Sequence, residues 1–155
     1  MTILNKTLIT ITGATASSKT SLAAHLAKDL EGEILSADSR QVYRRMNLGT
    51  GKDYKDYMVD GVKIPVHLID LVDAGYKYNV YEFQRDFRSA YDDIMNRGKQ
   101  AILCGGTGMY IDAVLNGYKL INVPVNNDLR SELEQKEMDE LIALLESKKK
   151  LHNVS

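Results

Sequence analysis

Residues 8–20 read Leu-Ile-Thr-Ile-Thr-Gly-Ala-Thr-Ala-Ser-Ser-Lys-Thr, a β-branched apolar run that passes into a short loop ending in Lys-Thr. This order is typical of a strand followed by a phosphate-binding loop, whose backbone N–H groups surround a phosphate at the start of a helix. The lysine adds positive charge, and the hydroxyl after it helps to hold Mg2+. The predicted phosphate-binding residues are Gly13, Ala14, Thr15, Ala16, Ser17, Ser18, Lys19 and Thr20, with Thr20 also the metal ligand.

One position of this loop departs from the pattern. Glycine normally precedes the lysine, and this chain has Ser18 there. The alternative interpretation is an ordinary strand-to-helix turn in which Ser17 or Ser18 is the N-cap. The residues that follow favour a helix over 20–30, because apolar side chains recur on one of its faces and Gly32 ends it. The residues on that face are Leu22, Leu26 and Leu30.

The composition is that of an ordinary globular chain. Of its 155 residues, 44% are hydrophobic and 26% are charged, and a chain of this length is most simply one domain with a sizeable core. The net charge of -1 gives no overall sign of nucleic-acid binding, so a polyanion would need a local basic cluster. The candidate cluster, whose alternative is a solvated surface, consists of Arg40, Arg44, Arg45, Lys52 and Lys55.

The single cysteine and the N-terminus bear on the compartment. Cys104 excludes an intrachain disulfide, which fits a reducing environment, and its place at the end of an apolar run predicts a buried strand residue. The N-terminus has no signal-peptide core, and no later segment approaches membrane-spanning length. We therefore expect a cytoplasmic protein that does not associate with a membrane.

Asp38 lies at the end of a second predicted strand, over residues 33–38, and a short helix is expected from Ser39. In open parallel sheets, ligands bind outside the carboxyl ends of the strands, which is also where the first strand places the phosphate loop. Asp38 is therefore expected either to face the phosphate site or to cap the helix that follows, and the sequence favours neither.

Strand-like and helix-like segments alternate through the middle of the chain, which predicts an α/β fold with a parallel sheet flanked by helices. The segments are a possible hairpin over 57–64 around Asp60-Gly61, a strand over 66–71, a helix from 80 to Gly98, a strand over 100–104 and a helix over 109–115. Asn79 and Glu82 have capping-box spacing at the start of the first of these helices. Its predicted core residues are Val80, Phe83, Phe87, Tyr91 and Ile94.

A second loop of small residues, 105–108, follows the strand over 100–104. It lets backbone approach a ligand closely and is expected to bring the Thr107 hydroxyl into the same crevice as Gly13 and Asp38. His67 has no second histidine or cysteine at metal-ligand spacing, so we interpret it as a structural histidine.

The character of the chain changes at Asn126, which predicts a core over 1–125 and a helical segment over 126–155. A single long helix is expected over 127–150, with a leucine stripe that nothing after it could cover. The stripe consists of Leu129, Leu133, Leu141, Leu144 and Leu145.

With these motifs placed, the sequence resembles the tRNA dimethylallyltransferases, also called tRNA isopentenyltransferases, and the related adenylate isopentenyltransferases. The resemblance rests on four ordered blocks across residues 8–118. These are the loop over 13–20; residues 36–43 followed by Met46 and Gly49-Thr50; His67-Leu68-Ile69-Asp70 with Arg97-Gly98-Lys99; and residues 105–110. The resemblance implies a P-loop nucleoside-triphosphate-hydrolase-like core that ends at the start of a helical insertion.

The resemblance also implies a reaction, the transfer of a dimethylallyl group from dimethylallyl diphosphate to N6 of an adenine, in tRNA or in a free adenine nucleotide. Asp38 matches the family's catalytic aspartate and would remove the amine proton, while Thr107 would hydrogen-bond near the reacting centre. Lys19, with the loop amides and a Mg2+ ion held partly by Thr20, would stabilise the leaving diphosphate. The acceptor-binding positions implied are Asp38, Ser39, Arg40 and Gln41.

Two departures from the family pattern bear on this expectation. Ser18 replaces the family glycine, and Ala14 replaces a usual proline. Family members also continue through the helical insertion that grips tRNA and then return to complete the core, so weakened tRNA binding is expected here. The alternatives are a small-molecule P-loop kinase that uses ATP, which would need an arginine-bearing lid, and an inactive truncated fragment.

Overall fold

The computed structural model describes residues 7–52 and 54–148. The chain divides between Leu120 and Ile121 into two compact units. Each unit is described by itself below.

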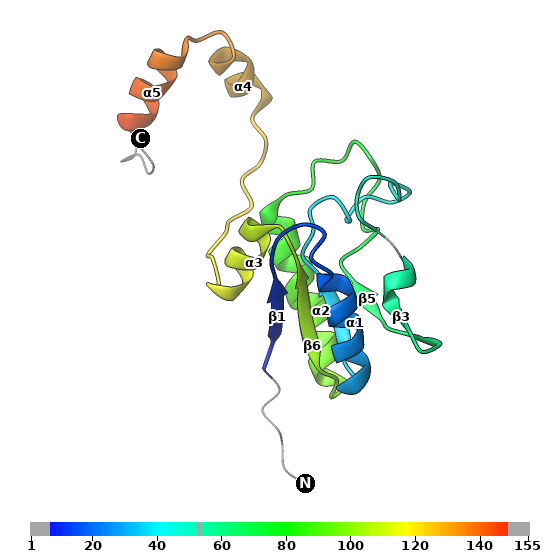
Figure 1. The fold of residues 1–155 in the computed structure, drawn as a ribbon. Helices are drawn as coiled ribbons and strands as arrows, with labels where there is room; N and C mark the ends of the chain where they lie inside the picture. Colours follow the sequence, from blue (N-terminus) through cyan, green and yellow to red (C-terminus); the bar gives the residue numbers. More distant parts are fainter. Residues whose placement is uncertain (1–6, 53, 149–155) are drawn as a thin grey trace. The chain divides into compact units, whose positions relative to one another are not determined.

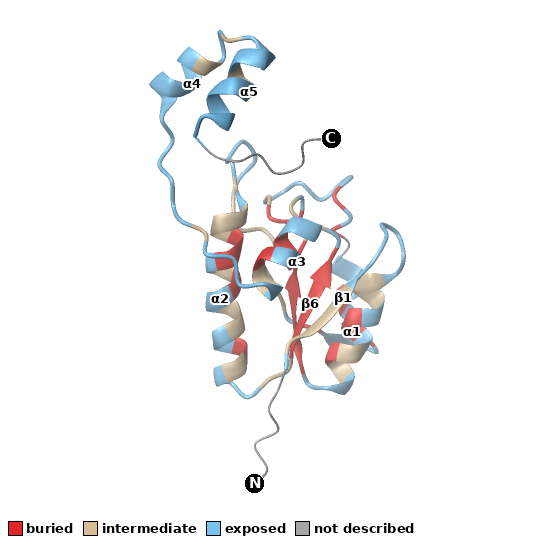
Figure 2. Cartoon of the chain, turned by 90° about the vertical axis from the view of Figure 1, so that its left-hand side faces the viewer, coloured by how far each residue is buried: buried red, intermediate tan, exposed pale blue. Residues whose placement is uncertain are grey.

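The first unit is built on a four-stranded parallel sheet of order β1-β6-β2-β5. One helix, α1 (Lys19–Asp29), covers one face, while α2 (Val80–Asn96) and α3 (Gly108–Leu115) cover the other (Figures 1 and 2). The predicted α/β fold is therefore confirmed. The strands are β1 (Ile9–Thr12), β2 (Glu33–Ser36), β5 (Val66–His67) and β6 (Ala101–Gly105).

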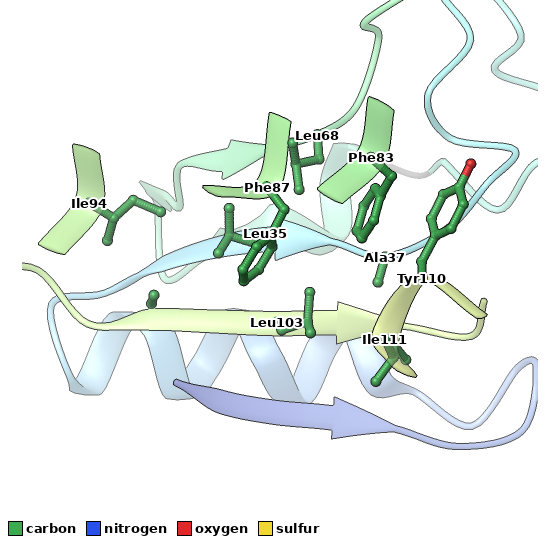
Figure 3. Close-up of a cluster of buried hydrophobic side chains, with 10 residues drawn as sticks. Leu35, Ala37, Leu68, Phe83, Phe87, Ile94, Leu103, Tyr110 and Ile111 are labelled. Carbon is green, nitrogen blue, oxygen red and sulfur yellow. The ribbon is translucent and has the colours of Figure 1, made fainter. Parts of the chain in front are cut away.

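The core on the α2 face forms as the apolar spacing of that helix predicts. Side chains of α2 lie over Leu35 of β2 and Leu103 of β6, and the ring of Phe83 stacks on that of Tyr110 with 4.1 Å between centroids (Figure 3). The capping box is present, because Asn79 Oδ1 accepts a hydrogen bond from the Glu82 backbone N–H at 3.1 Å. The buried apolar residues of α2 are Phe83, Phe87 and Ile94.

The opposite face of the sheet is packed differently from what the leucine spacing of α1 suggests. Leu22 is 60% exposed and Leu30 42% exposed, whereas the buried residues of α1 are alanines. A short 3-10 helix, η1 (Tyr54–Tyr57), packs against this side, and only small side chains let it approach so closely. The alanines are Ala23, Ala24 and Ala27.

The hairpin after η1 is confirmed. Strands β3 (Met58–Val59) and β4 (Val62–Lys63) pair in antiparallel fashion. The two residues between them, Asp60 and Gly61, both have positive φ, +49° and +78°, as a tight two-residue hairpin turn requires.

Two predictions about the strands were wrong in part. Strand β2 ends at Ser36, and turns follow Asp38 in place of the expected short helix, with Arg45 at φ +61° where a helix cannot continue. The strand expected over 66–71 ends at His67, because Leu68 and Asp70 have φ of +65° and +53°, which turn the chain out of the ladder.

The second unit has two helices, α4 (Asn127–Leu133) and α5 (Met138–Glu146), so the single long helix expected over 127–150 is wrong. The chain breaks at 134–137, and Leu129, Leu133 and Leu141 line one apolar groove that a straight helix could not form. Neither helix has a buried residue. Residues 149 and 150 lie outside the described part of the chain. Within that part, no helix is long and apolar enough to cross a membrane.

Candidate functional site

Three strands of the sheet end side by side, and the site lies beyond those ends. Thr12 of β1 is in register with Gly105 of β6, and Ser36 of β2 is in register with Cys104. The loops that follow the three strands therefore start from one edge. Gly105 has no room for a side chain, because a Cβ there would lie 2.3 Å from the Ala37 carbonyl oxygen.

These loops enclose a cavity of about 180 Å³. The volume is below the roughly 300 to 1,000 Å³ of sites for drug-sized ligands, so it suits a compact anion better than a whole nucleotide. The predicted site residues in its wall are Thr15, Ala16, Lys19, Thr20, Asp38, Arg40, Gln41 and Thr107. The other predicted residues, Gly13, Ala14, Ser17, Ser18 and Ser39, do not line it.

The phosphate loop is closed on itself in this structure. Lys19 Nζ and Ser17 Oγ both donate hydrogen bonds to the Ala14 carbonyl oxygen, the latter at 2.7 Å. Lys19 Nζ also lies 3.4 Å from Ser17 Oγ. A bound phosphate would compete with these contacts for the lysine charge, which is already directed to the loop interior.

Ser18 has a left-handed backbone conformation, which glycine, the usual residue at this position of the loop pattern, adopts without strain. Its φ of +57° and ψ of +24° are left-handed, and a non-glycine residue there costs roughly 1 to 3 kcal/mol. Ser18 is the N-cap residue of α1 by position, but its side chain makes no capping hydrogen bond. The alternative interpretation is therefore right that Ser18 occupies the N-cap position, but wrong that it acts as an ordinary side-chain cap.

Asp38 is held by the turn that it begins. Its Oδ1 accepts a hydrogen bond from the Arg40 backbone N–H at 2.9 Å, and Arg40 Nε lies 3.7 Å from the same oxygen. Its side chain is 19% exposed. Because no helix follows, the helix-cap interpretation of Asp38 is wrong, and its second carboxylate oxygen is left for the cavity that it lines.

The residues beside Asp38 divide into structural and accessible side chains. Gln41 is buried, accepts a hydrogen bond from Ser36 Oγ at 3.0 Å and donates one to the Gly51 carbonyl oxygen at 3.2 Å. Arg40, by contrast, has a side chain that is 60% exposed. Of the predicted acceptor-binding residues that follow Asp38, Arg40 therefore has the side chain best placed to meet an incoming ligand.

Lys52 is not part of a solvated basic surface. Its side chain is fully buried, with Nζ 2.6 Å from Asp70 Oδ1 and 2.6 Å from the Tyr43 carbonyl oxygen. Burial raises the pKa of the Asp70 carboxyl, but hydrogen bonds from Lys52 and Tyr54 outweigh that effect and leave the pKa below its usual value. This buried pair ties residues 43–52 to the segment after β5.

His67 is confirmed as a structural residue. Its Nε2 lies 2.7 Å from Glu33 Oε2, and Arg97 contacts both oxygens of the same carboxylate. Arg97, with His67 as a second partner and against the effect of burial, lowers the pKa of Glu33 to about 2. This cluster surrounds Glu33, the first residue of β2, and the cavity lies beyond the other end of that strand.

Seven wall residues were not predicted as site residues, namely Ser36, Thr50, Gly51, Tyr57, Cys104, Gly105 and Gly106. Cys104 is buried, as predicted, and burial raises the pKa of its thiol to about 11. Tyr57 comes from η1, and nothing in its local sequence distinguishes it from a residue of the predicted hairpin. Only the packing of η1 on α1 brings it to the cavity.

The side chains available as metal ligands limit how a metal ion could be bound. Within residues 7–52 and 54–148, no group of three or more His, Cys, Asp or Glu side chains could hold a metal ion. Thr20 lies in the cavity wall beside Lys19, as the hydroxyl of a phosphate loop does when it shares Mg2+ with a phosphate. The residues therefore fit a metal that enters with a phosphorylated ligand.

The fold and the loop define a P-loop α/β protein. A family model described as IPP transferase matches residues 41–154, so the chain belongs to the IPP transferase family.

Curated relatives agree with this family. The chain is 62% identical over 146 residues to tRNA dimethylallyltransferase 2 of Phocaeicola vulgatus and 60% identical over 146 residues to tRNA dimethylallyltransferase 1 of Parabacteroides distasonis. Each alignment covers 94% of this chain and 48% of the relative. The chain thus spans about half the length of the curated relatives it matches.

Solved structures are similar as well. The full-length tRNA isopentenylpyrophosphate transferase of Bacillus halodurans matches with a TM-score of 0.70 and 38% identity, over 83% of this chain and 42% of that one. A eukaryotic dimethylallyltransferase acting on tRNA matches with a TM-score of 0.74 and 26% identity, over 91% of this chain and 35% of that one.

Proposed function

We propose that this chain carries the diphosphate site and the proton acceptor of a tRNA dimethylallyltransferase. The reaction would move a dimethylallyl group from dimethylallyl diphosphate to N6 of an adenine in tRNA. One observation carries the proposal: Lys19 and Thr20 of the phosphate loop line the same small cavity as Asp38 and Thr107. A group that would bind a leaving diphosphate and a group that would accept a proton thus line one cavity.

Asp38 would act as the general base. The exocyclic amine of adenine is a weak nucleophile, because its lone pair is delocalised into the ring, so a proton must leave as the C–N bond forms. The Asp38 carboxylate is partly exposed and its Oδ1 is fixed by the Arg40 N–H, which orients the other oxygen. This arrangement would offer an oriented proton acceptor to an amine bound in the cavity.

The phosphate loop would stabilise the leaving group. As the allylic C–O bond breaks, negative charge develops on the diphosphate, and fixed positive groups lower the barrier by binding that charge. Lys19 supplies a full positive charge, and the N-terminus of α1 adds its backbone N–H groups. Thr20 would hold Mg2+ together with the diphosphate oxygens, and the ion would neutralise part of their charge.

The acceptor would approach along Arg40. Its largely exposed guanidinium is suited to a phosphate of the acceptor strand. A free adenine nucleotide offers the same adenine and a single phosphate, so it is the second acceptor to be tested. The names of the relatives favour tRNA.

Product mass tests the proposal. The protein is incubated with Mg2+ and either dimethylallyl diphosphate or ATP, each with unmodified tRNA or with adenosine monophosphate. We expect an adenine heavier by one dimethylallyl group in the tRNA reaction with dimethylallyl diphosphate. Transfer of phosphate from ATP in place of prenyl transfer would favour the kinase alternative, and absence of any product would favour the inactive fragment.

A further inference from the structure

Tyr57 is a buried tyrosine that the proposed chemistry does not use. It is the last residue of η1, is 4% exposed, and lines the same cavity as Lys19 and Thr20 of the phosphate loop. Its ring belongs to the cluster formed with the alanines of α1. Those small residues give the ring room to lie against the helix whose N-terminus forms the phosphate site.

The Tyr57 hydroxyl has no hydrogen-bond partner among the described residues. The backbone of Tyr57 is engaged, since its carbonyl oxygen accepts a hydrogen bond from the Ile64 N–H at 2.8 Å. In the described part of the chain, no side-chain oxygen or nitrogen is both sealed from solvent and unsatisfied. The hydroxyl of this buried residue must therefore reach open space, and the space that Tyr57 borders is the cavity.

The surroundings of the Tyr57 hydroxyl favour its protonated form, which can act as a hydrogen-bond donor. Burial, with smaller effects from Cys104, Asp56, Asp38 and Tyr54, raises the pKa of the Tyr57 phenol above its usual value. The phenol thus keeps its proton through the neutral range. A neutral hydroxyl beside an anion site can donate a hydrogen bond without adding negative charge.

We propose that the Tyr57 hydroxyl donates a hydrogen bond to an oxygen of the diphosphate held by Lys19 and Thr20. Tyr57 is then a further ligand-binding residue. When diphosphate is bound, it links η1 to the phosphate loop through the ligand. The inference rests on the diphosphate site of the proposed function. It predicts that affinity for diphosphate depends on a single phenolic oxygen, because hydrogen bonds to charged groups are among the stronger ones.

The test compares Tyr57→Phe with the parent by calorimetric titration with inorganic diphosphate in Mg2+. Phenylalanine keeps the ring against α1 and removes only the oxygen. The matched control is Tyr78→Phe, which removes a hydroxyl that donates to Asp86 Oδ2 at 2.8 Å and does not line the cavity. We expect about tenfold weaker diphosphate binding for Tyr57→Phe and parental affinity for the control. The thermal midpoint of Tyr57→Phe should stay close to that of the parent.

Each other outcome is decisive. Equal affinity of Tyr57→Phe and the parent would overturn this inference and leave the proposed function standing. Equal weakening by both variants would also overturn it, because the effect would then not be specific to the cavity. A parent that binds no diphosphate would overturn the diphosphate site, and with it both proposals.

Discussion

Thr107 holds the backbone of Ser39 from 68 positions away in the sequence, because Thr107 Oγ1 accepts a hydrogen bond from the Ser39 N–H at 2.9 Å. The same hydroxyl lies 3.3 Å from Ser39 Oγ, and the Thr107 N–H donates to the Ala37 carbonyl oxygen at 3.0 Å. Both residues that flank Asp38 are therefore bonded to one residue of the β6 loop. Thr107 fixes the place of the carboxylate.

Replacing Thr107 by valine, which has the same shape without the hydroxyl, is expected to lower kcat about tenfold or more. The reason is that Asp38 would lose its fixed position, and small displacements of a reacting group are costly. Thr107→Ser should keep most of the rate. Diphosphate affinity, measured by titration, should stay near the parental value in both variants. A parental kcat in Thr107→Val would contradict the positioning role.

Asp38→Asn is expected to reduce prenyl transfer by at least about a hundredfold, since an amide has the shape of the carboxylate but cannot accept the proton. Diphosphate affinity should be nearly unchanged. The control is Asp60→Asn at the exposed turn of the β3–β4 hairpin, which should leave the rate as it is. Activity of Asp38→Asn within tenfold of the parent would remove Asp38 from the role of base.

Ser18→Gly is expected to tighten Mg2+-dependent diphosphate binding about tenfold, because glycine has no Cβ where the loop amides close on the phosphate. Relief of the left-handed strain at residue 18 should in addition stabilise the fold. The control is Glu31→Gly. Glu31 is also left-handed, at φ +48°, but lies beyond the end of α1 and does not line the cavity, so its replacement should stabilise the fold and leave affinity alone. Equal or weaker binding by Ser18→Gly would show that the serine does not weaken the diphosphate site.

The lowered pKa of Glu33 predicts how the free energy of unfolding depends on pH. Its pKa is lowered from 4.5 to about 2 in the folded state, chiefly by Arg97. A lowered pKa stabilises the fold above about pH 4.5, and this stabilisation is lost as pH falls from there toward 2. Because Arg97 is 43% exposed, solvent screening limits the contribution to about 1 to 2 kcal/mol.

Denaturant unfolding at pH 7 and at pH 3 measures this contribution. Glu33→Gln should lower the free energy of unfolding at pH 7 and make it less sensitive to pH over this range. Glu31→Gln is the control, because Glu31 pairs with Lys99 at the surface and its side chain is 84% exposed. The same pH dependence in Glu33→Gln as in the parent would show that other carboxylates govern acid unfolding.

Amide exchange should be faster in α4 and α5 than in β6. Neither helix has a buried residue, whereas all five residues of β6 are buried. Few buried apolar contacts make local opening easy. Exchange in α4 and α5 as slow as in β6, in a monomeric protein, would contradict this expectation.

Local patterns predicted those parts of the fold that local chemistry decides. The capping box at Asn79, the Asp60-Gly61 turn and the apolar spacing of α2 all depend on residues close together in the chain, and all are present. The leucines of α1 show the limit of this reasoning. Helical spacing predicted the helix, but the buried face was decided by the approach of η1, which is a tertiary effect.

The candidate site likewise contains residues that local sequence could place and residues that only tertiary packing places. Lys19, Asp38 and Thr107 could be placed together because each follows a strand, and parallel strands end at one edge. Tyr57 could not be placed, since its position depends on how a hairpin folds over α1. The break between α4 and α5 was missed for a similar reason: it contains no glycine or proline, and it is accompanied by an apolar groove formed from both helices.

The position of β6 in the sheet has a consequence for synthesis of the chain. Among residues 7–52 and 54–148, β1 pairs only with β6. Strand β6 lies between β1 and β2, although it is the last of the four strands to leave the ribosome. Until β6 emerges, β1 has no strand to pair with, and closing so long a loop is slow. A nascent chain that already contains Lys19 and Asp38 therefore has both residues and still no site.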